Sequence, residues 1–112
     1  MSTGSRRALR LHVAVLEELG RGAFASQAIH GQDAFRDELP NAHHRWRSES
    51  NTVVLHSAPP EELARLIREC TTLGIPHALF REEDRGGEIT CVIADPYHPL
   101  TARAYKGIPL AT

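Results

Sequence analysis

The sequence predicts a mixed α/β fold, and three observations point to it. Short β-type segments at residues 9–16, 52–56, 77–81 and 88–94 alternate with helical patterns. A clean apolar stripe with start and stop signals marks a helix from residue 60 onward. A short polar turn, residues 82–87, joins the last two strands and predicts an antiparallel hairpin. We therefore expect three α/β/α layers around a four-stranded mixed sheet, in the order βα(α)βαββα.

Length and composition are typical of one soluble domain. The chain has 112 residues, 41% of them hydrophobic and 24% charged, which argues against wholesale disorder. We expect a flexible arm over residues 1–9 and a single domain over residues 10–112. The formal net charge is −1, so a nucleic-acid partner would have to be bound by a local arginine patch.

The first half of the chain predicts strand, turn, helix and strand. Residues 13–16 are continuously apolar, as in a central strand buried on both faces. Phe24, Ala28, Phe35 and Leu39 then recur at helical spacing until Pro40 ends the pattern. Residues 41–50 are polar around a tryptophan and fit either a short second helix or a packed loop. β-Branched residues at 52–56 predict the second strand.

The second half contains the most regular helix. Leu63, Leu66, Ile67 and Cys70 form an i, i+3, i+4, i+7 stripe that ends at Gly74. After the predicted hairpin, Asp95-Pro96 is typical of the start of a helix, which we expect to run to about residue 105.

Candidate chemistry gathers in the turn and helix that follow the first strand. Gln27 and His30 are three residues apart, so they share one helix face. An imidazole exchanges protons near neutral pH, and a carboxamide beside it can orient a carbonyl or a ribose hydroxyl. Two neighbouring groups that only hydrogen-bond to the surrounding fold would give the same spacing.

The acidic turn after the third strand supplies carboxylates. Glu82, Glu83 and Asp84 lie there, and one of them could face the first helix across the sheet edge. A solvated acidic turn has the same composition.

Other reactive side chains predict structural roles or none. His12, His56 and His77 fall on strands and are expected to be structural, and Cys70 and Cys91 to be buried thiols. The histidine spacing predicts no metal site, and neither a dinucleotide-binding motif nor a P-loop is present. We expect no cofactor. No apolar run approaches the roughly 20 residues of a membrane span, so we expect a cytoplasmic protein without a membrane partner.

Five segments in order resemble the type 2 peptidyl-tRNA hydrolases. They are Ala25-Ser-Gln-Ala-Ile-His30, Asn51-Thr-Val-Val-Leu55, Pro60-Glu-Glu-Leu63, Leu73-Gly-Ile-Pro-His-Ala-Leu79 and Ile89-Thr-Cys-Val-Ile93. The resemblance runs from about residue 13 to residue 110. It implies an α/β/α fold with the first and third strands near the fourth, and often a homodimer.

The resemblance implies cleavage of the ester between a peptide and the terminal ribose of tRNA. Of the family's Gly-Lys, Ala-Ala-Gln and His motif, Gln27 and His30 match, and Ser26 replaces one alanine. The motif lysine aligns with Ala23. Asp84 corresponds to the family's functional aspartate, with Glu82 as the other alignment.

We therefore expect a protein that binds the acceptor end of peptidyl- or aminoacyl-tRNA and cleaves its ester. His30 would handle the proton, Asp84 would orient water, and Gln27 would hold the carbonyl or ribose. The expected substrate contacts are Ser26, Arg21 and the cluster Arg45-Trp46-Arg47, with Trp46 as a stacking platform. Two alternatives remain open: acyl transfer from tRNA to a small amine, and a non-catalytic tRNA- or protein-binding module.

Overall fold

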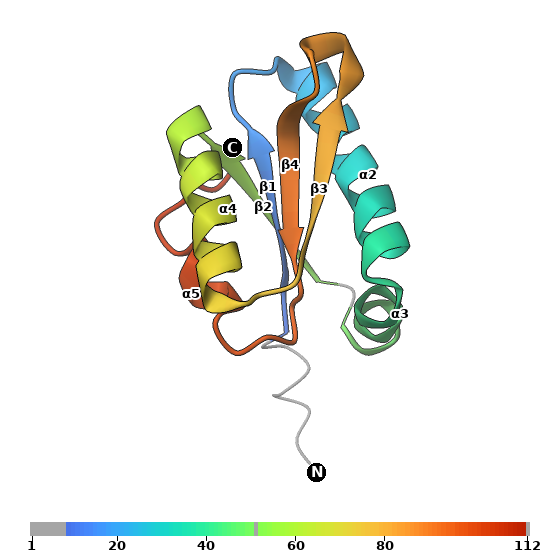
Figure 1. The fold of residues 1–112 in the computed structure, drawn as a ribbon. Coiled ribbons are helices and arrows are strands. Elements are labelled where there is room, and N and C mark those ends of the chain that lie inside the picture. Colours follow the sequence, from blue (N-terminus) through green and yellow to red (C-terminus); the bar gives the residue numbers. More distant parts are fainter. Residues whose placement is uncertain (1–8, 51, 112) are drawn as a thin grey trace.

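The computed structural model describes residues 9–50 and 52–111. The chain runs through β1 (Leu11–Leu16), α2 (Arg21–Glu38), α3 (Pro40–Glu49), β2 (Val53–Ala58), α4 (Pro60–Leu73), β3 (His77–Glu82), the 3-10 turn η1 (Glu83–Arg85), β4 (Glu88–Ala94) and α5 (Thr101–Tyr105) (Figure 1). The predicted arm, residues 1–9, lies outside the described residues except for Leu9.

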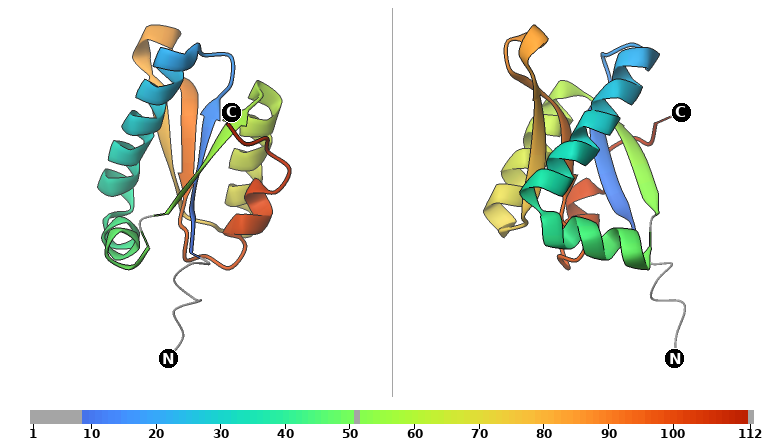
Figure 2. Two further views of the ribbon diagram at one scale, coloured as in Figure 1. Left: turned by 180° about the vertical axis from the view of Figure 1, so that it is seen from behind. Right: turned by 90° about the vertical axis from the view of Figure 1, so that its right-hand side faces the viewer.

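The sheet has the strand order β2-β1-β4-β3. β1 pairs in parallel with β2, and β4 pairs antiparallel with both β1 and β3. Since β1 and β3 are both antiparallel to β4, they run in the same direction and end at the same edge of the sheet. α2 and α3 cover one face, and α4 and α5 cover the other (Figures 1 and 2). The predicted fold class is confirmed.

The core is aliphatic and centres on β1 and β4. These two strands are buried on both faces, which explains why residues 13–16 and 91–94 are continuously apolar. α4 packs its predicted stripe on the sheet: Leu63, Leu66 and Cys70 are buried. Gly74 ends this helix at φ 69°, a left-handed conformation that favours glycine, and its N–H bonds to the Cys70 and Thr71 carbonyls.

Two segments differ from or refine the sequence-based expectation. Residues 40–49 form a helix, α3, which was one of the two alternatives. The terminal helix is shorter than predicted, because the Asp95 carboxylate accepts a hydrogen bond from the Tyr97 N–H and folds the start of this segment into a turn. α5 therefore begins only at Thr101.

A pair of histidines lies under α5, between β1 and β2. His56 Nδ1 is 3.1 Å from the Ile108 carbonyl oxygen, which can only accept, so Nδ1 carries the proton. His56 Nε2 must then accept from His12 Nδ1, 2.9 Å away. Burial and the neighbouring His56 lower the pKa of His12 to about 4, and burial also lowers the pKa of His56. The predicted structural role of both side chains is confirmed.

The C-terminal segment closes the free edge of β2. The Ser57 N–H donates to the Pro109 carbonyl, and the Ala111 N–H donates to the Leu55 carbonyl, each at 2.9 Å. This pairing, together with the His56 contact to Ile108, fixes residues 108–111 beside the end of β2.

Candidate functional site

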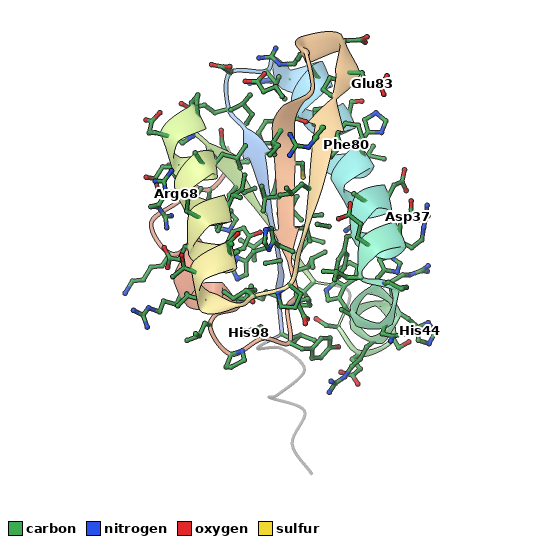
Figure 3. All side chains as sticks on the ribbon, in the orientation of Figure 1. Asp37, His44, Arg68, Phe80, Glu83 and His98 are labelled. Atoms are coloured by element: carbon green, nitrogen blue, oxygen red, sulfur yellow. The ribbon has the colours of Figure 1, made fainter. Side chains whose placement is uncertain are left out.

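The best-connected polar cluster lies where α2 faces the ends of β3 and β4. We call Gln27, His30, Phe80, Glu82 and Thr90 the Gln27 cluster. The topology explains this meeting: β1 and β3 end at the same sheet edge, α2 begins just after β1, and Glu82 is the last residue of β3. Figure 3 labels Phe80 on β3 beside α2, close to where the hairpin turns.

Gln27 is the centre of the cluster. Its side chain is only 6% exposed, and its Nε2 donates to Glu82 Oε2 at 2.8 Å. Its Oε1 accepts a hydrogen bond from the hydroxyl of Thr90, which is fully buried, at 2.5 Å. The ionised Glu82 carboxylate can only accept, so it faces the N–H side of the amide, and Gln27 Oε1 is left to accept from the Thr90 hydroxyl.

Glu82 is held as a carboxylate at the rim of the cluster. The Gln27 hydrogen bond is the main cause that lowers its pKa, helped by the Asp84 N–H and by the charge of His30. The same side chain caps the turn η1 through the Asp84 N–H. An ionised, partly exposed carboxylate is therefore presented beside an imidazole.

The His30 ring packs against Phe80, which lies two residues before Glu82 on β3. The two rings stack with centroids 4.7 Å apart and an interplanar angle of 18°. Phe80 and Glu82 are two residues apart on β3, so stacking on one brings the imidazole near the other. The structure thus brings together Gln27 and His30, as the helix spacing predicted.

The carboxylate in the cluster is Glu82, and Asp84 contributes its backbone. Of the two alignments, Glu82 is the one whose side chain contacts Gln27: Asp84 lies in η1, its side chain is exposed, and its N–H bonds to Glu82. The register passes from Phe80 opposite Cys91 to Arg81 opposite Ile89, so Thr90 is an extra residue on β4, and its hydroxyl reaches Gln27. The buried Gln27 amide, expected to hold the carbonyl or ribose of a substrate, bonds to Glu82 and Thr90 in the structure.

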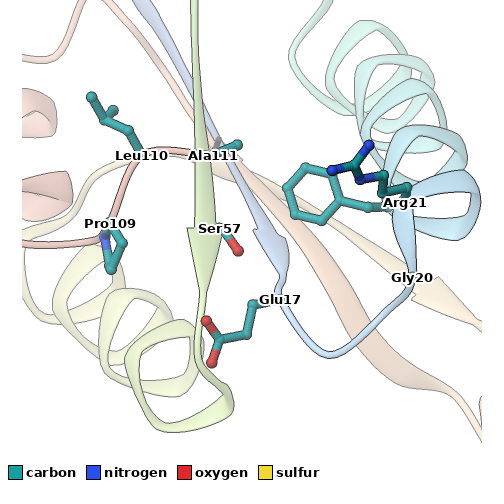
Figure 4. A pocket seen from close by; sticks show the side chains of 8 residues that line it. Glu17, Gly20, Arg21, Ser57, Pro109, Leu110 and Ala111 are labelled. Atoms are coloured by element: carbon teal, nitrogen blue, oxygen red, sulfur yellow. The ribbon is translucent and has the colours of Figure 1, made fainter.

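The start of α2 is tied to the hairpin by an ion pair. Arg85 in η1 contacts Glu18 in the β1–α2 loop at 3.1 Å and also pairs with Glu88. Ser26 and Ala23 are exposed on α2 near the cluster. Arg21 lies one turn earlier, in the wall of a separate groove with Glu17 and Ser57 (Figure 4).

The predicted contacts on α3 lie far from this site. Figure 3 shows His44, on α3, at the opposite end of the molecule from the hairpin. Trp46 is only 3% exposed, its indole N–H donates to the Thr52 carbonyl, and its ring packs edge-on against Phe35. Trp46 is therefore a core residue, and the expected stacking platform is wrong because no ring face is free for a base.

Arg45 and Arg47 share this location. Arg45 lies 3.9 Å over the Tyr97 ring and pairs with Glu49 at 3.2 Å, which attaches α3 to the segment after β4. Arg47, in the last turn of α3, is exposed. Neither residue contacts the Gln27 cluster, so the structure does not bring these two predicted substrate contacts to the site.

Residues 9–50 and 52–111 contain neither a candidate metal centre nor a membrane-spanning helix. No three His, Cys, Asp or Glu side chains in these ranges gather in a group that could hold a metal ion. No helix within the same ranges has the length and apolarity needed to cross a bilayer. Cys70 and Cys91 are buried free thiols, as expected, and burial raises the pKa of Cys91 to about 12.

Comparisons with known proteins establish the fold alone. No protein-family model matches this chain. No curated protein sequence matches it either. A solved structure of the protein of unknown function Atu0240 from Agrobacterium tumefaciens strain C58 superposes with a TM-score of 0.69. The match covers 92% of this chain and 97% of that chain at 11% sequence identity, so it describes a shared architecture.

Two members of the Gln27 cluster were missed in the sequence. Thr90 sits in a β-branched strand segment, where threonine is ordinary, and Phe80 reads as a core residue. A Thr and a Glu at the facing ends of a predicted hairpin are a weak signal, because only the strand register shows whether their side chains reach the same helix.

Proposed function

We propose that this protein hydrolyses the ester between an acyl group and the terminal ribose of tRNA. The observation that supports the proposal most is the ordered contact Thr90 to Gln27 to Glu82, which presents an ionised carboxylate beside His30. Such an arrangement suits a reaction in which a positioned side chain takes a proton from water. The resemblance in sequence supplies the substrate class.

His30 is assigned the proton transfer. Its imidazole takes a proton from the attacking water as the water oxygen bonds to the ester carbonyl carbon. When the carbon–oxygen bond to the ribose breaks, the same proton passes to the ribose oxygen, which leaves a free hydroxyl and a carboxylic acid. Glu82 stabilises the positive charge that the imidazole gains during this step.

Gln27 and Thr90 are positioning residues in this proposal. Neither reaches the substrate, because both side chains are buried and bonded to each other. They hold Glu82 at one place and in its charged form, as outer partners do for ligands in other sites. Ser26 is exposed on α2 and is retained as a substrate contact.

A second candidate, tRNA binding without turnover, is favoured by one observation. Ala23 presents an exposed methyl group where the resembled family has a lysine. Without that cation the charge that develops on the carbonyl oxygen has less stabilisation. The proposed partner, the tRNA acceptor end, is common to both candidates, as are a cytoplasmic location and a homodimer.

The test is deacylation of charged tRNA by the purified protein, compared with a heat-inactivated sample. Hydrolysis that is lost in the His30→Ala, Glu82→Gln double variant supports the proposal, and undiminished hydrolysis in that variant contradicts it. Salt-dependent tRNA binding without deacylation assigns the protein to the second candidate. Running the reaction with and without a small amine identifies acyl transfer, because transfer consumes charged tRNA only when the amine is present.

A further inference from the structure

A groove of about 820 Å³ lies beside the first turn of α2, outside the Gln27 cluster. Glu17 and Ser57, at the ends of β1 and β2, form one side, and Arg21 and Phe24 on α2 form the other. Figure 4 shows Glu17 and Ser57 on the β2 side, and Arg21 across from them. This volume lies within the usual range of about 300–1,000 Å³ for small-molecule sites.

The third side of the groove is held in place by the fold. Residues 109–111 line it and pair with β2 through the Ser57 N–H and the Leu55 carbonyl. His56, buried and bonded to Ile108, fixes the start of this segment. The three sides of the groove, formed by the strand ends, the helix α2 and the C-terminal segment, are therefore all held in place by the fold.

The two charged side chains of the groove, Glu17 and Arg21, are exposed to solvent. In the part of the chain that the structure describes, neither the Arg21 guanidinium nor the Glu17 carboxylate has an ion pair or a side-chain hydrogen bond. The neighbouring Glu18, by contrast, forms an ion pair with Arg85. A ligand that carries a negative group and a hydrogen-bond donor would satisfy both.

Phe24 adds an aromatic surface between these charges. Its ring is partly buried and lines the groove. An arginine, an aromatic ring and a carboxylate together match the three parts of a nucleotide: phosphate, base plane and exocyclic amino group. Phe24 also lies three residues before Gln27, and such residues are neighbours about 5–6 Å apart on a helix.

We infer that the groove binds the terminal nucleotide of single-stranded RNA, with an adenine base stacked on Phe24, its amino group bonded to Glu17 and its phosphate on Arg21. The inference rests on the proposed function, since it places the terminal nucleotide one helical turn from the Gln27 cluster. The same chemistry would accept a free nucleotide, and the experiment separates the two sources.

The experiment follows amide signals of the full chain by NMR during titration with AMP, IMP, inorganic phosphate and a short RNA ending in CCA. We expect shifts at residues 17–24, 57, 110 and 111, and tighter binding of the RNA than of AMP. IMP lacks the amino group of adenine and should bind about tenfold more weakly, because a hydrogen bond to a charged group is lost. Inorganic phosphate should bind most weakly.

Variants test each contact, with Arg68→Gln on α4 as the control. Phe24→Leu should weaken AMP binding about tenfold through lost stacking. Arg21→Gln should make the slope of log K for RNA binding against log salt concentration shallower by about 0.7. Arg68 is exposed on the opposite side of the sheet, so its variant should bind AMP as the unmodified protein does (Figure 3).

Several results overturn the inference. Equal affinity for AMP, IMP and phosphate would show that the groove does not recognise the base. Tighter binding of AMP than of the RNA would show that its ligand is a free nucleotide and not an RNA end. Unchanged AMP affinity in a folded Phe24→Leu variant removes the stacking contact. Deacylation without any AMP-induced shift in the groove contradicts this inference alone. Nucleotide binding without deacylation contradicts the hydrolase proposal and leaves the groove assignment supported.

Discussion

The Gln27 amide donates a 2.8 Å hydrogen bond to the Glu82 carboxylate, across 55 positions of the sequence. The contact joins the helix that follows the first strand to the end of the third strand. It gives this edge of the sheet an ionised side chain whose position and charge both depend on a buried partner. The predictions below test that dependence, the packing that permits it and the chemistry proposed for it.

Replacing Gln27 with methionine should raise the pKa of Glu82. The Gln27 hydrogen bond is the largest cause that keeps this pKa below its ordinary range. Methionine keeps the volume and removes the donor. The measurement is a pH titration of the Glu82 carboxyl carbon by NMR. Gln32→Met on the same helix is the matched control, and an equal titration of Glu82 in all three proteins would exclude the positioning role.

Gly31→Ala should destabilise the fold by about 1–3 kcal/mol. At this position α2 packs so closely on β4 that an added Cβ overlaps Cys91 Sγ. Gly22→Ala is the matched change in the same helix: a Cβ there meets nothing within 4 Å. It should stabilise the protein by up to about 1 kcal/mol through helix propensity. Urea unfolding measures both. Adding Cys91→Ala should restore part of the loss at Gly31, and an absence of any rescue would show that the overlap is not the cause.

Acidification should weaken the fold through the histidine pair. The pKa of His12 is lowered from 6.5 to about 4, so the unfolded chain binds the extra proton first. The contribution of neutral His12 to the free energy of unfolding is therefore fully present above about pH 6.5. It falls as the pH drops toward 4, by up to about 3 kcal/mol.

The check is urea unfolding across that range for the unmodified protein and for His12→Gln, which cannot titrate. The variant should show a flatter pH dependence. His44→Gln, at an exposed position on α3, should keep the original dependence. The same slope in all three proteins would contradict the assignment.

Ala23→Lys should raise the deacylation rate about tenfold or more by placing a cation near the carbonyl oxygen. The position is exposed, so the lysine needs no repacking. Ala25→Lys, also exposed on α2, adds the same charge on another face of the helix and should have little effect. Equal rates for both variants would show that the residue at 23 does not limit the reaction.

Much of the fold was predictable because local signals agreed with it. The apolar stripe and glycine stop of α4, the β-type segments and the short hairpin turn each correspond to one element. α3 was open to two interpretations because its single apolar anchor, Trp46, stands between two arginines. Its burial against Phe35 is a tertiary contact that the local pattern does not contain.

The site was half predictable for a similar reason. Gln27 and His30 follow from helix spacing, which is fixed by backbone geometry. The carboxylate does not, because Glu82 and Asp84 differ by two residues, and a strand ends between them at η1. The Thr90 contact does not follow from the local pattern either, because Thr90 is an extra residue on β4 opposite Phe80 and Arg81, and register is a property of the whole hairpin.

The most direct test compares single-turnover deacylation of charged tRNA by the unmodified protein, Glu82→Gln and Asp84→Asn. Both substitutions remove one carboxylate near the end of β3, but only Glu82 contacts Gln27. The rate should fall about 100-fold in Glu82→Gln. It should stay within about twofold in Asp84→Asn, as for an exposed side chain outside the site. A loss confined to Asp84→Asn, or equal rates in all three proteins, would contradict the role assigned to Glu82.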